Sequence, residues 1–456
     1  MKSSISGFPE FLPNEQIAFN GVIDTIREHF ELYGFVPMDT PAVERISTLL
    51  AKGNDNEIYG LYRIADEDSK KDLGLRFDLT VPLARYVVEN HGQLIFPHKR
   101  YQISPVWRGE RSQHGRYRQF YQCDIDILGS RELSVEHDAE IVALISEVLL
   151  SLKVPSFHTK LNNRKILSGF IKTIALEEYV VEIVRLMDKA DKISVEEFEE
   201  SVKPLLAAPE NLGKLKIFLN AEKRGRNSDV LRWLKSLNLG EEYEQGVQEL
   251  STVLQILKKL GLEENLVKIS TRLARGLAYY TGIIFETTFD ENLNDLGSIA
   301  GGGRYEDLTK TLSDQSDKTF PGVGGTIGVS RLVPKLIEKG ILPTDRLSPG
   351  QILVTVQNRE LIGCYMKIAS KLRRVGVKTE TYLHNKSLGA QLTYASKKGY
   401  RFVIIANDVE LLENKAILRN LKTHDQLLVS TEYFGNEFLE LIHPDSHFTT
   451  HFCPRV

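Results

Sequence analysis

The segment Arg100–Gly129, with the sequence RYQISPVWRGERSQHGRYRQFYQCDIDILG, is compatible with few folds. Its second half alternates with the period of two that a β-strand gives to its side chains. One face is mainly apolar, suits a core, and comprises Gln119, Tyr121, Cys123, Ile125 and Ile127. The other face carries hydrogen-bonding groups around one aromatic ring and comprises Arg118, Phe120, Gln122, Asp124 and Asp126. The segment predicts a β-hairpin with one face turned toward a ligand.

The loop of this predicted hairpin is polar and basic. Arg108 and Glu110 share one face of the first strand, and Arg111, His114 and Arg116 follow in the loop. Planar guanidinium groups are favoured partners of phosphates and carboxylates. We expect the hairpin to project the loop side chains outward. A solvated polar hairpin is the alternative, and we favour a ligand site.

A second polar segment, LGLRFDLTVPLARYV (73–87), places Arg76, Asp78 and Thr80 at alternate positions before a helix expected near 81–90. Thr80 suits a helix N-cap as well as it suits a binding site. Both interpretations therefore stay open for this segment taken alone.

Two glycine-rich stretches follow later, AGGGRYEDL (300–308) and GVGGTIGVSRL (322–332). Neither has the glycine spacing of a dinucleotide-binding fold or the lysine of a phosphate-binding P-loop. Glycine still allows a backbone to approach a ligand closely. Arg331, at the end of the second stretch, is a candidate phosphate contact.

Changes of periodicity predict the domain organisation of the 456 residues, a length typical of two or three domains. Residues 1–336 form one predicted domain, interrupted at about 165–262 by a charged helical insertion. Residues 337–350 resemble a linker, and 351–456 alternate strand and helix as in a small βαβ-type domain with a parallel or mixed sheet. The predicted fold class is α/β, of the α+β type.

Composition excludes few functions. The formal net charge of −3 allows nucleic-acid binding only through local basic faces. Three scattered cysteines without a CxxC pair predict neither a disulfide framework nor a zinc site. No run of 18 apolar residues and no signal-peptide core is present, so we expect a cytoplasmic protein without membrane association.

With these segments in place, the chain resembles the histidyl-tRNA synthetases, a family of class II aminoacyl-tRNA synthetases. GFVPMDTP resembles their motif 1, VWRGERSQHGRYRQFYQCDIDILG their motif 2 and GVGGTIGVSRL their motif 3. LRFDLTVP and RGLAYYTG resemble the two histidine-specific signatures. The resemblance covers almost the whole chain.

The resemblance implies a catalytic domain on an antiparallel sheet, a homodimer interface at motif 1 and a C-terminal anticodon-binding domain. It implies ATP, used with Mg²⁺, L-histidine and tRNA(His) as substrates, and no protein-bound metal site. In a first step the histidine carboxylate attacks the α-phosphorus of ATP and forms histidyl-adenylate. In a second step the histidyl group passes to the 3′-terminal adenosine of the tRNA.

The resemblance also implies roles for individual residues. Arg108, Arg275 and Arg331 would neutralise charge during catalysis, and Arg108, Glu110, Phe120 and Arg331 would bind ATP. Histidine would be held by Asp78, Thr80, Gln122, Asp126, Tyr279 and Tyr280, with Asp126 and Tyr280 on the imidazole. Arg111, Gln113 and Arg116 would approach the tRNA acceptor end, as would the helical insertion unless it is only scaffold.

Two departures from the family pattern stand out. Ala278 occupies a position where the signature normally reads aspartate, and IIANDVELLE differs from the usual glycine–glutamate pattern. We interpret Ala278 as tuning the site without abolishing activity. The alternatives are a regulatory subunit of ATP phosphoribosyltransferase and a tRNA-binding regulator. The intact arginines and the presence of residues 351–456 favour an active synthetase.

Overall fold

The computed structural model describes residues 4–50, 61–64, 72–109, 111–112, 115–189, 194–262, 264–274, 280–290, 297–306 and 319–442. The chain divides into two compact units. The first comprises Met1–Glu10 and Gly21–Ile341, and the second Phe11–Asn20 and Leu342–Val456. The chain passes into the second unit at Leu342, within the segment expected to be a linker.

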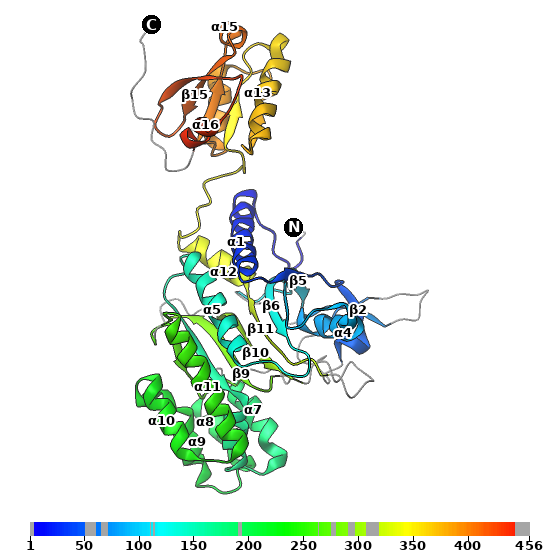
Figure 1. The fold of residues 1–456 in the computed structure, drawn as a ribbon, viewed down its shortest axis with the longest axis vertical. Coiled ribbons are helices and arrows are strands. Elements are labelled where there is room, and N and C mark those ends of the chain that lie inside the picture. Colours follow the sequence, from blue (N-terminus) through cyan, green and yellow to red (C-terminus); the bar gives the residue numbers. More distant parts are fainter. Residues whose placement is uncertain are drawn as a thin grey trace. The chain divides into compact units, whose positions relative to one another are not determined.

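The first unit is built on an eight-stranded sheet with the order β1-β5-β6-β11-β10-β9-β7-β8 (Figure 1). The strands are β1 (Val36–Pro37), β5 (His98–Trp107), β6 (Gln119–Leu128), β7 (Phe157–Asn163), β8 (Val267–Ile269), β9 (Ile283–Phe289), β10 (Ser298–Tyr305) and β11 (Gly322–Ile327). The two end pairs are parallel and all inner pairs are antiparallel. The prediction of an antiparallel sheet is therefore confirmed for its centre.

The predicted hairpin forms the β5–β6 pair, in which Trp107 lies opposite Gln119. The apolar face of β6 packs into the core, with Cys123, Ile125 and Ile127 fully buried. On that side α5 (Glu136–Ser151) lays Ile141 and Ile145 against β11. Strand alternation then turns the polar side chains of β6 to the opposite face of the sheet.

The segment before the hairpin corrects one expectation. α4 (Thr80–Asn90) starts at Thr80, which is the first helical residue and not a cap. The Asp78 carboxylate does the capping work instead: its Oδ1 accepts a hydrogen bond of 3.0 Å from the Val81 backbone N–H. Beside this helix lie α2 (Ile46–Leu49) and a small sheet of β2 (Val43–Arg45), β4 (Leu73–Leu75) and β3 (Arg63–Ile64).

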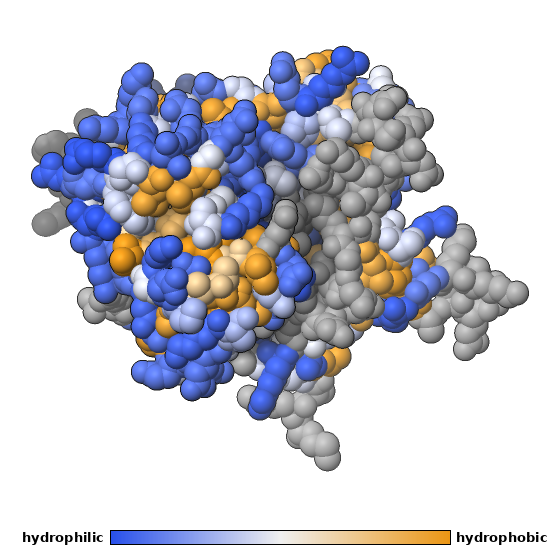
Figure 2. Space-filling view, turned by 90° about the horizontal axis from the view of Figure 1, so that it is seen from below, coloured by the Kyte–Doolittle hydropathy of each residue, from blue (hydrophilic) through white to orange (hydrophobic). Residues whose placement is uncertain are grey.

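The predicted insertion is helical. Its helices are α6 (Arg164–Lys172), α7 (Val180–Lys189), α8 (Val195–Val202), α9 (Asn211–Leu219), α10 (Asn227–Leu237) and α11 (Glu241–Lys259). Phe170 of α6 stacks on Phe218 of α9 with ring centroids 3.9 Å apart. Figure 2 looks onto the molecule from the insertion end, where hydrophilic side chains surround smaller apolar patches.

Two further α-helices in the described part of the first unit are α1 (Pro13–Leu32), whose first residues belong to the second unit, and α12 (Val329–Glu338). Strand character at 279–288 was expected, whereas β9 starts only at Ile283. No helix in the described ranges is long and apolar enough to cross a membrane.

The second unit contains a mixed sheet with the order β13-β12-β14-β15-β16. Its strands are β12 (Ile352–Val354), β13 (Thr379–Thr381), β14 (Phe402–Ile405), β15 (Lys415–Asn420) and β16 (Gln426–Ser430), and its helices are α13 (Ile362–Arg374), α14 (Leu388–Lys397), α15 (Asp408–Leu412) and α16 (Asn436–Leu441). The first three strands in this order are parallel, and the β14–β15 and β15–β16 pairs are antiparallel. This is the mixed βαβ-type arrangement that the sequence predicted.

Candidate active site

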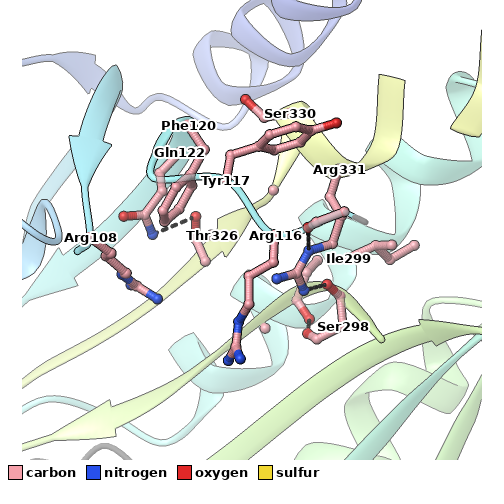
Figure 3. Close-up of a pocket in the computed structure, with 14 residues that line it drawn as sticks. Arg108, Arg116, Tyr117, Phe120, Gln122, Ser298, Ile299, Thr326, Ser330 and Arg331 are labelled. Atoms are coloured by element: carbon pink, nitrogen blue, oxygen red, sulfur yellow. Dashed lines mark hydrogen bonds between the residues drawn. The ribbon is translucent and has the colours of Figure 1, made fainter. Parts of the chain in front are cut away.

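A cavity opens on the polar face of β6, between the hairpin loop, β10, β11 and the start of α12 (Figure 3). Side chains that line it include Arg108, Arg116, Tyr117, Phe120, Gln122 and Arg331. Three of these six are arginines, so the cavity favours an anion. The aromatic rings beside them suit a planar group.

Arg108 is held at the base of the hairpin. Its Nε donates a 3.1 Å hydrogen bond to the Phe77 carbonyl, and its guanidinium carbon lies 5.1 Å from the centre of the Phe120 ring. A guanidinium over an aromatic face is attracted by the ring quadrupole. These contacts fix the cation beside Asp78, whose pKa it lowers.

Arg331 is held by two backbone carbonyls. Its Nε donates to Gly115 at 2.8 Å and its Nη1 donates to Ser298 at 2.7 Å. The first bond ties the hairpin loop to α12, so residues 115–117 fold over the cavity. Arg116 is exposed, as expected for an outward loop, and it also lines the cavity beside Arg331 (Figure 3). Arg111 is exposed, as expected.

A buried acidic group lies next to this basic cavity. Asp78, Asp124 and Asp126 are all buried and interact electrostatically with one another. Burial raises the pKa of Asp78 to about 6 and that of Asp124 to about 7, with nearby arginines acting in the opposite direction. A buried carboxylate in such surroundings gains from a cationic partner.

Asp126 is held by both of its oxygens. Oδ2 pairs with the Arg100 guanidinium at 2.6 Å, and Oδ1 accepts a 2.7 Å hydrogen bond from the Tyr305 hydroxyl. Burial raises the pKa of Asp126, whereas Arg100 and the Tyr305 hydrogen bond lower it. The pair is fully enclosed, since Arg100 and Asp126 expose 0% and 3% of their side chains.

The glycine-rich strands give these side chains room. A Cβ at Gly324 would collide with the Asp126 carboxylate, and one at Gly303 would lie 2.8 Å from the Tyr280 ring. Both glycines face the pocket, on neighbouring strands. Glycine was expected to admit a ligand close to the backbone. At these two positions glycine makes room for the Asp126 carboxylate and the Tyr280 ring.

Several buried polar atoms of this group have no hydrogen-bond partner among the described residues: Asp78 Oδ2, Gln122 Oε1, Asp124 Oδ1, Arg100 Nε and Arg100 Nη1. Leaving such atoms unpaired is costly, so a polar ligand or ordered water is the usual explanation. The atoms Asp78 Oδ2, Gln122 Oε1 and Asp124 Oδ1 are acceptors, which an ammonium group would satisfy.

The structure thus brings Arg108, Phe120, Gln122 and Arg331 around one cavity and gathers Asp78, Asp126 and Tyr280 beside it, with Thr80 at the start of α4. Glu110, Gln113, His114, Arg275, Ala278 and Tyr279 lie outside the described residues. Within the described part of the chain no group of three acidic, histidine or cysteine side chains could hold a metal ion.

Arg100, Tyr305 and Thr326 are pocket residues that the sequence patterns did not identify. For Arg100 a signal existed: counting seven residues back on β5 from Trp107 and seven forward on β6 from Gln119 places Arg100 opposite Asp126. Asp124 lies on the polar face already identified. Nothing local pointed to Tyr305, whose partner Asp126 is 179 residues away in the chain.

A largely antiparallel sheet with an arginine-lined cavity beside a buried acidic pocket, joined to a separate mixed-sheet unit, is the arrangement of a class II aminoacyl-tRNA synthetase. The profile of one family, described as histidyl-tRNA synthetase, matches residues 7–332, and that of an anticodon-binding domain matches residues 351–441. The chain belongs to the histidyl-tRNA synthetase family.

Individual relatives agree with this assignment. The histidine–tRNA ligase of Nostoc punctiforme is 38% identical over 453 residues, covering 94% of this chain and 95% of its own length. That of Clostridium tetani is 38% identical over 431 residues, covering 94% and 96%. The crystal structure of histidyl-tRNA synthetase from Nostoc sp. PCC 7120 superposes with a TM-score of 0.84 at 37% identity, covering 95% and 97%.

A structure described as an ATP phosphoribosyltransferase regulatory subunit/histidyl-tRNA synthetase from Bacillus halodurans C also superposes, with a TM-score of 0.70. It is 19% identical and covers 86% of this chain and 96% of its own. At that identity the likeness concerns the fold alone. The relatives with higher identity support tRNA charging and not the regulatory alternative.

Proposed function

We propose that the chain ligates L-histidine to the 3′ end of tRNA(His) in two steps that consume ATP and release pyrophosphate and AMP. The observation that carries this proposal is the position of Gln122, which lines the arginine-rich cavity and belongs to the buried polar pocket. One side chain thus borders both a phosphate site and an ammonium site. Amino-acid activation requires these two sites to adjoin, because the carboxylate must reach the α-phosphorus.

In the first step the histidine carboxylate attacks the α-phosphorus of ATP, and pyrophosphate leaves. Such phosphoryl transfer depends on positioning and charge stabilisation. Arg108 lies between the two pockets and serves the α-phosphate and the carboxylate. Phe120 and Arg331 enclose the adenine, with Glu110 assisting, and Arg275 adds charge at the α-phosphate. ATP enters with Mg²⁺, which neutralises phosphate charge.

The same site orients histidine. Asp78, Thr80 and Gln122 receive the α-ammonium group, and Asp126 and Tyr280 receive the imidazole, with Tyr279 nearby. In the second step a ribose hydroxyl of the terminal tRNA adenosine attacks the activated carbonyl, and AMP leaves. The anticodon-binding domain over 351–456 supplies a second contact with tRNA, and Arg111 and Gln113 approach the acceptor end.

The decisive experiment is ATP–pyrophosphate exchange with each amino acid in turn. We expect exchange with histidine alone, and charging only of tRNA(His). A protein that binds tRNA but exchanges pyrophosphate with no amino acid would be a regulator and would refute the proposal.

We further propose a homodimer that uses the motif 1 region. β1 is an end strand of the large sheet, and apolar side chains around it are exposed: Leu32 by 81%, Val36 by 47% and Ile95 by 86%. Exposed apolar groups next to an open strand edge suit a partner surface. Light scattering of the purified protein should give twice the 51.7 kDa chain mass, and Leu32→Lys should shift it toward the monomer.

The Asp78 carboxylate predicts a pH dependence of histidine binding. Its pKa of about 6 results from burial, opposed by the Val81 hydrogen bond and Arg108 and reinforced by Asp126. Only the ionised form attracts the α-ammonium, so affinity should decline as pH falls through 6 and weaken about 10-fold one unit below. Calorimetric titrations should show this decline in the wild type.

The control is Asp78→Asn, which removes the titrating group. Free histidine also gains a proton on its imidazole in this pH range. The variant keeps the pH dependence that comes from the imidazole and loses the pH dependence that comes from Asp78. Identical pH profiles for variant and wild type would contradict the assignment.

Arg116 now carries a different prediction from the one that an outward loop suggested. Since it lines the cavity, Arg116→Ala should raise the KM for ATP in the exchange reaction roughly 10-fold, the value of about one exposed charge-assisted hydrogen bond. The KM for histidine should stay unchanged. A loss confined to tRNA charging would favour the outward orientation instead.

A further inference from the structure

Three polar side chains on two neighbouring strands lie in a row beside the proposed substrate pocket. Gln122 and Asp124 are two residues apart on β6, so they share a face, and Thr326 of β11 lies opposite Asp124. Gln122 and Asp124 are buried, and Thr326 lines the cavity. The family resemblance assigned a role only to Gln122.

The hydrogen bonds along this chain have a direction. Gln122 Nε2 donates to the Thr326 hydroxyl oxygen at 3.3 Å (Figure 3). Thr326 lies opposite Asp124 on the neighbouring strand, and its hydroxyl, acting as a donor toward this carboxylate, lowers the pKa of Asp124 against the larger effect of burial. Above its pKa of about 7 the Asp124 carboxylate is ionised and only accepts, so Thr326 then gives its single proton to Asp124. The hydroxyl oxygen can then receive only a donor, which is the NH₂ side of the amide.

This direction decides which end of the Gln122 amide faces the pocket. With Nε2 turned to Thr326, Oε1 is buried and has no hydrogen-bond partner among the described residues. A free glutamine amide rotates between two orientations of almost the same shape. In the opposite orientation the pocket would present an NH₂ group, which repels an ammonium.

We propose that Asp124 and Thr326 are positioning residues that lock the Gln122 amide with its oxygen toward the α-ammonium group of the substrate. The inference rests on the proposed function, since it assumes an amino acid in this pocket. It adds two residues on which recognition of the amino group depends.

The test compares Thr326→Val, which keeps the shape but removes the hydroxyl, with Thr326→Ser, which keeps the hydroxyl. We expect Thr326→Val to weaken histidine binding, measured by calorimetry without ATP, roughly 10-fold, the value of about one hydrogen bond to a charged group. Thr326→Ser should bind within about 2-fold of wild type.

A second measurement separates amide orientation from local packing. Glutamate at position 122 presents an oxygen in either orientation, so Thr326 has nothing left to orient. In a double-mutant cycle, Thr326→Val should therefore cost histidine affinity in the wild-type background but not in the Gln122→Glu background. Asp124→Asn allows the hydrogen bonds from Gln122 through Thr326 to run in either direction. This variant should therefore weaken histidine binding about as much as Thr326→Val.

Equal losses of affinity in both backgrounds, or wild-type affinity in Thr326→Val, would overturn the inference. Absence of histidine binding and of exchange in the wild type would instead refute the proposed function. The two failures are therefore distinguishable.

Discussion

Arg108→Ala should reduce histidine-dependent ATP–pyrophosphate exchange by about 10³-fold or more, the range observed when a transition-state cation is removed from phosphoryl transfer. Arg108 is fixed by the Phe77 carbonyl and the Phe120 ring at the junction of the two pockets. Its charge is therefore positioned before the substrates arrive. A pre-positioned charge acts most strongly where it requires no reorganisation during the reaction.

Steady-state exchange at saturating histidine and ATP measures this loss as a fall in kcat. Arg108→Lys is the informative companion, because lysine keeps the charge but not the planar fork that spans a phosphate and a carboxylate. We expect it to restore only a small part of the rate. Arg185→Ala, at an exposed position on α7, is the matched control and should leave the exchange rate unchanged. An Arg108→Ala rate within 10-fold of wild type would exclude a role for Arg108 at the α-phosphate.

Arg100→Met should destabilise the folded protein by about 3–5 kcal/mol, because it leaves the buried Asp126 carboxylate without its cation. Such a loss is a large part of the stability of a typical domain. The variant should also lose histidine affinity, since Arg100 holds one oxygen of the carboxylate assigned to the imidazole. Chemical denaturation and calorimetric binding measure the two effects.

The neighbouring Lys99 is the matched control. It pairs with Glu140, but both side chains are about a quarter exposed, and such pairs contribute only about 0–1 kcal/mol. Lys99→Met should therefore be nearly neutral. If the two variants lost equal stability, the buried pair would have no special role.

The pH dependence of Arg100→Met gives a further check. Arg100 lowers the pKa of Asp124 and of Asp126, both raised by burial. Without Arg100, both carboxyls bind a proton more tightly in the folded than in the unfolded chain. The free energy of unfolding therefore falls as pH rises and these carboxyls ionise. The deficit of the variant should therefore be larger at about pH 8 than at about pH 5. Adding Asp126→Asn should recover stability without recovering histidine binding.

Local periodicity was sufficient for the elements that build the site. Alternation along 118–127 identified the polar face of β6, and helical patterning identified the insertion and α13. The alternation also placed the second strand of the hairpin, β6, correctly. These are properties of consecutive residues, which strand and helix geometry translates directly into faces.

The interpretation of Thr80 as the helix N-cap was wrong because a cap depends on backbone angles, which propensity does not determine. An aspartate two residues earlier caps the helix in its place. The prediction of an outward loop was incomplete for a related reason, since Arg116 is exposed but also lines the cavity. A basic loop favours solvent by composition, but the Arg331–Gly115 hydrogen bond, across 216 residues, folds it over the cavity.

By itself, the sequence determined the hairpin, the order of the domains and the arginines and carboxylates that make amino-acid activation the natural chemistry. Tertiary structure alone decided how those groups are used. Gly324 and Gly303 make room for Asp126 and Tyr280, Arg100 pairs with Asp126, and Thr326 accepts a hydrogen bond from the Gln122 amide. The physical reason is that each of these relations joins different strands. Periodicity assigns a side chain to a face, but only the packed sheet determines its neighbour on that face.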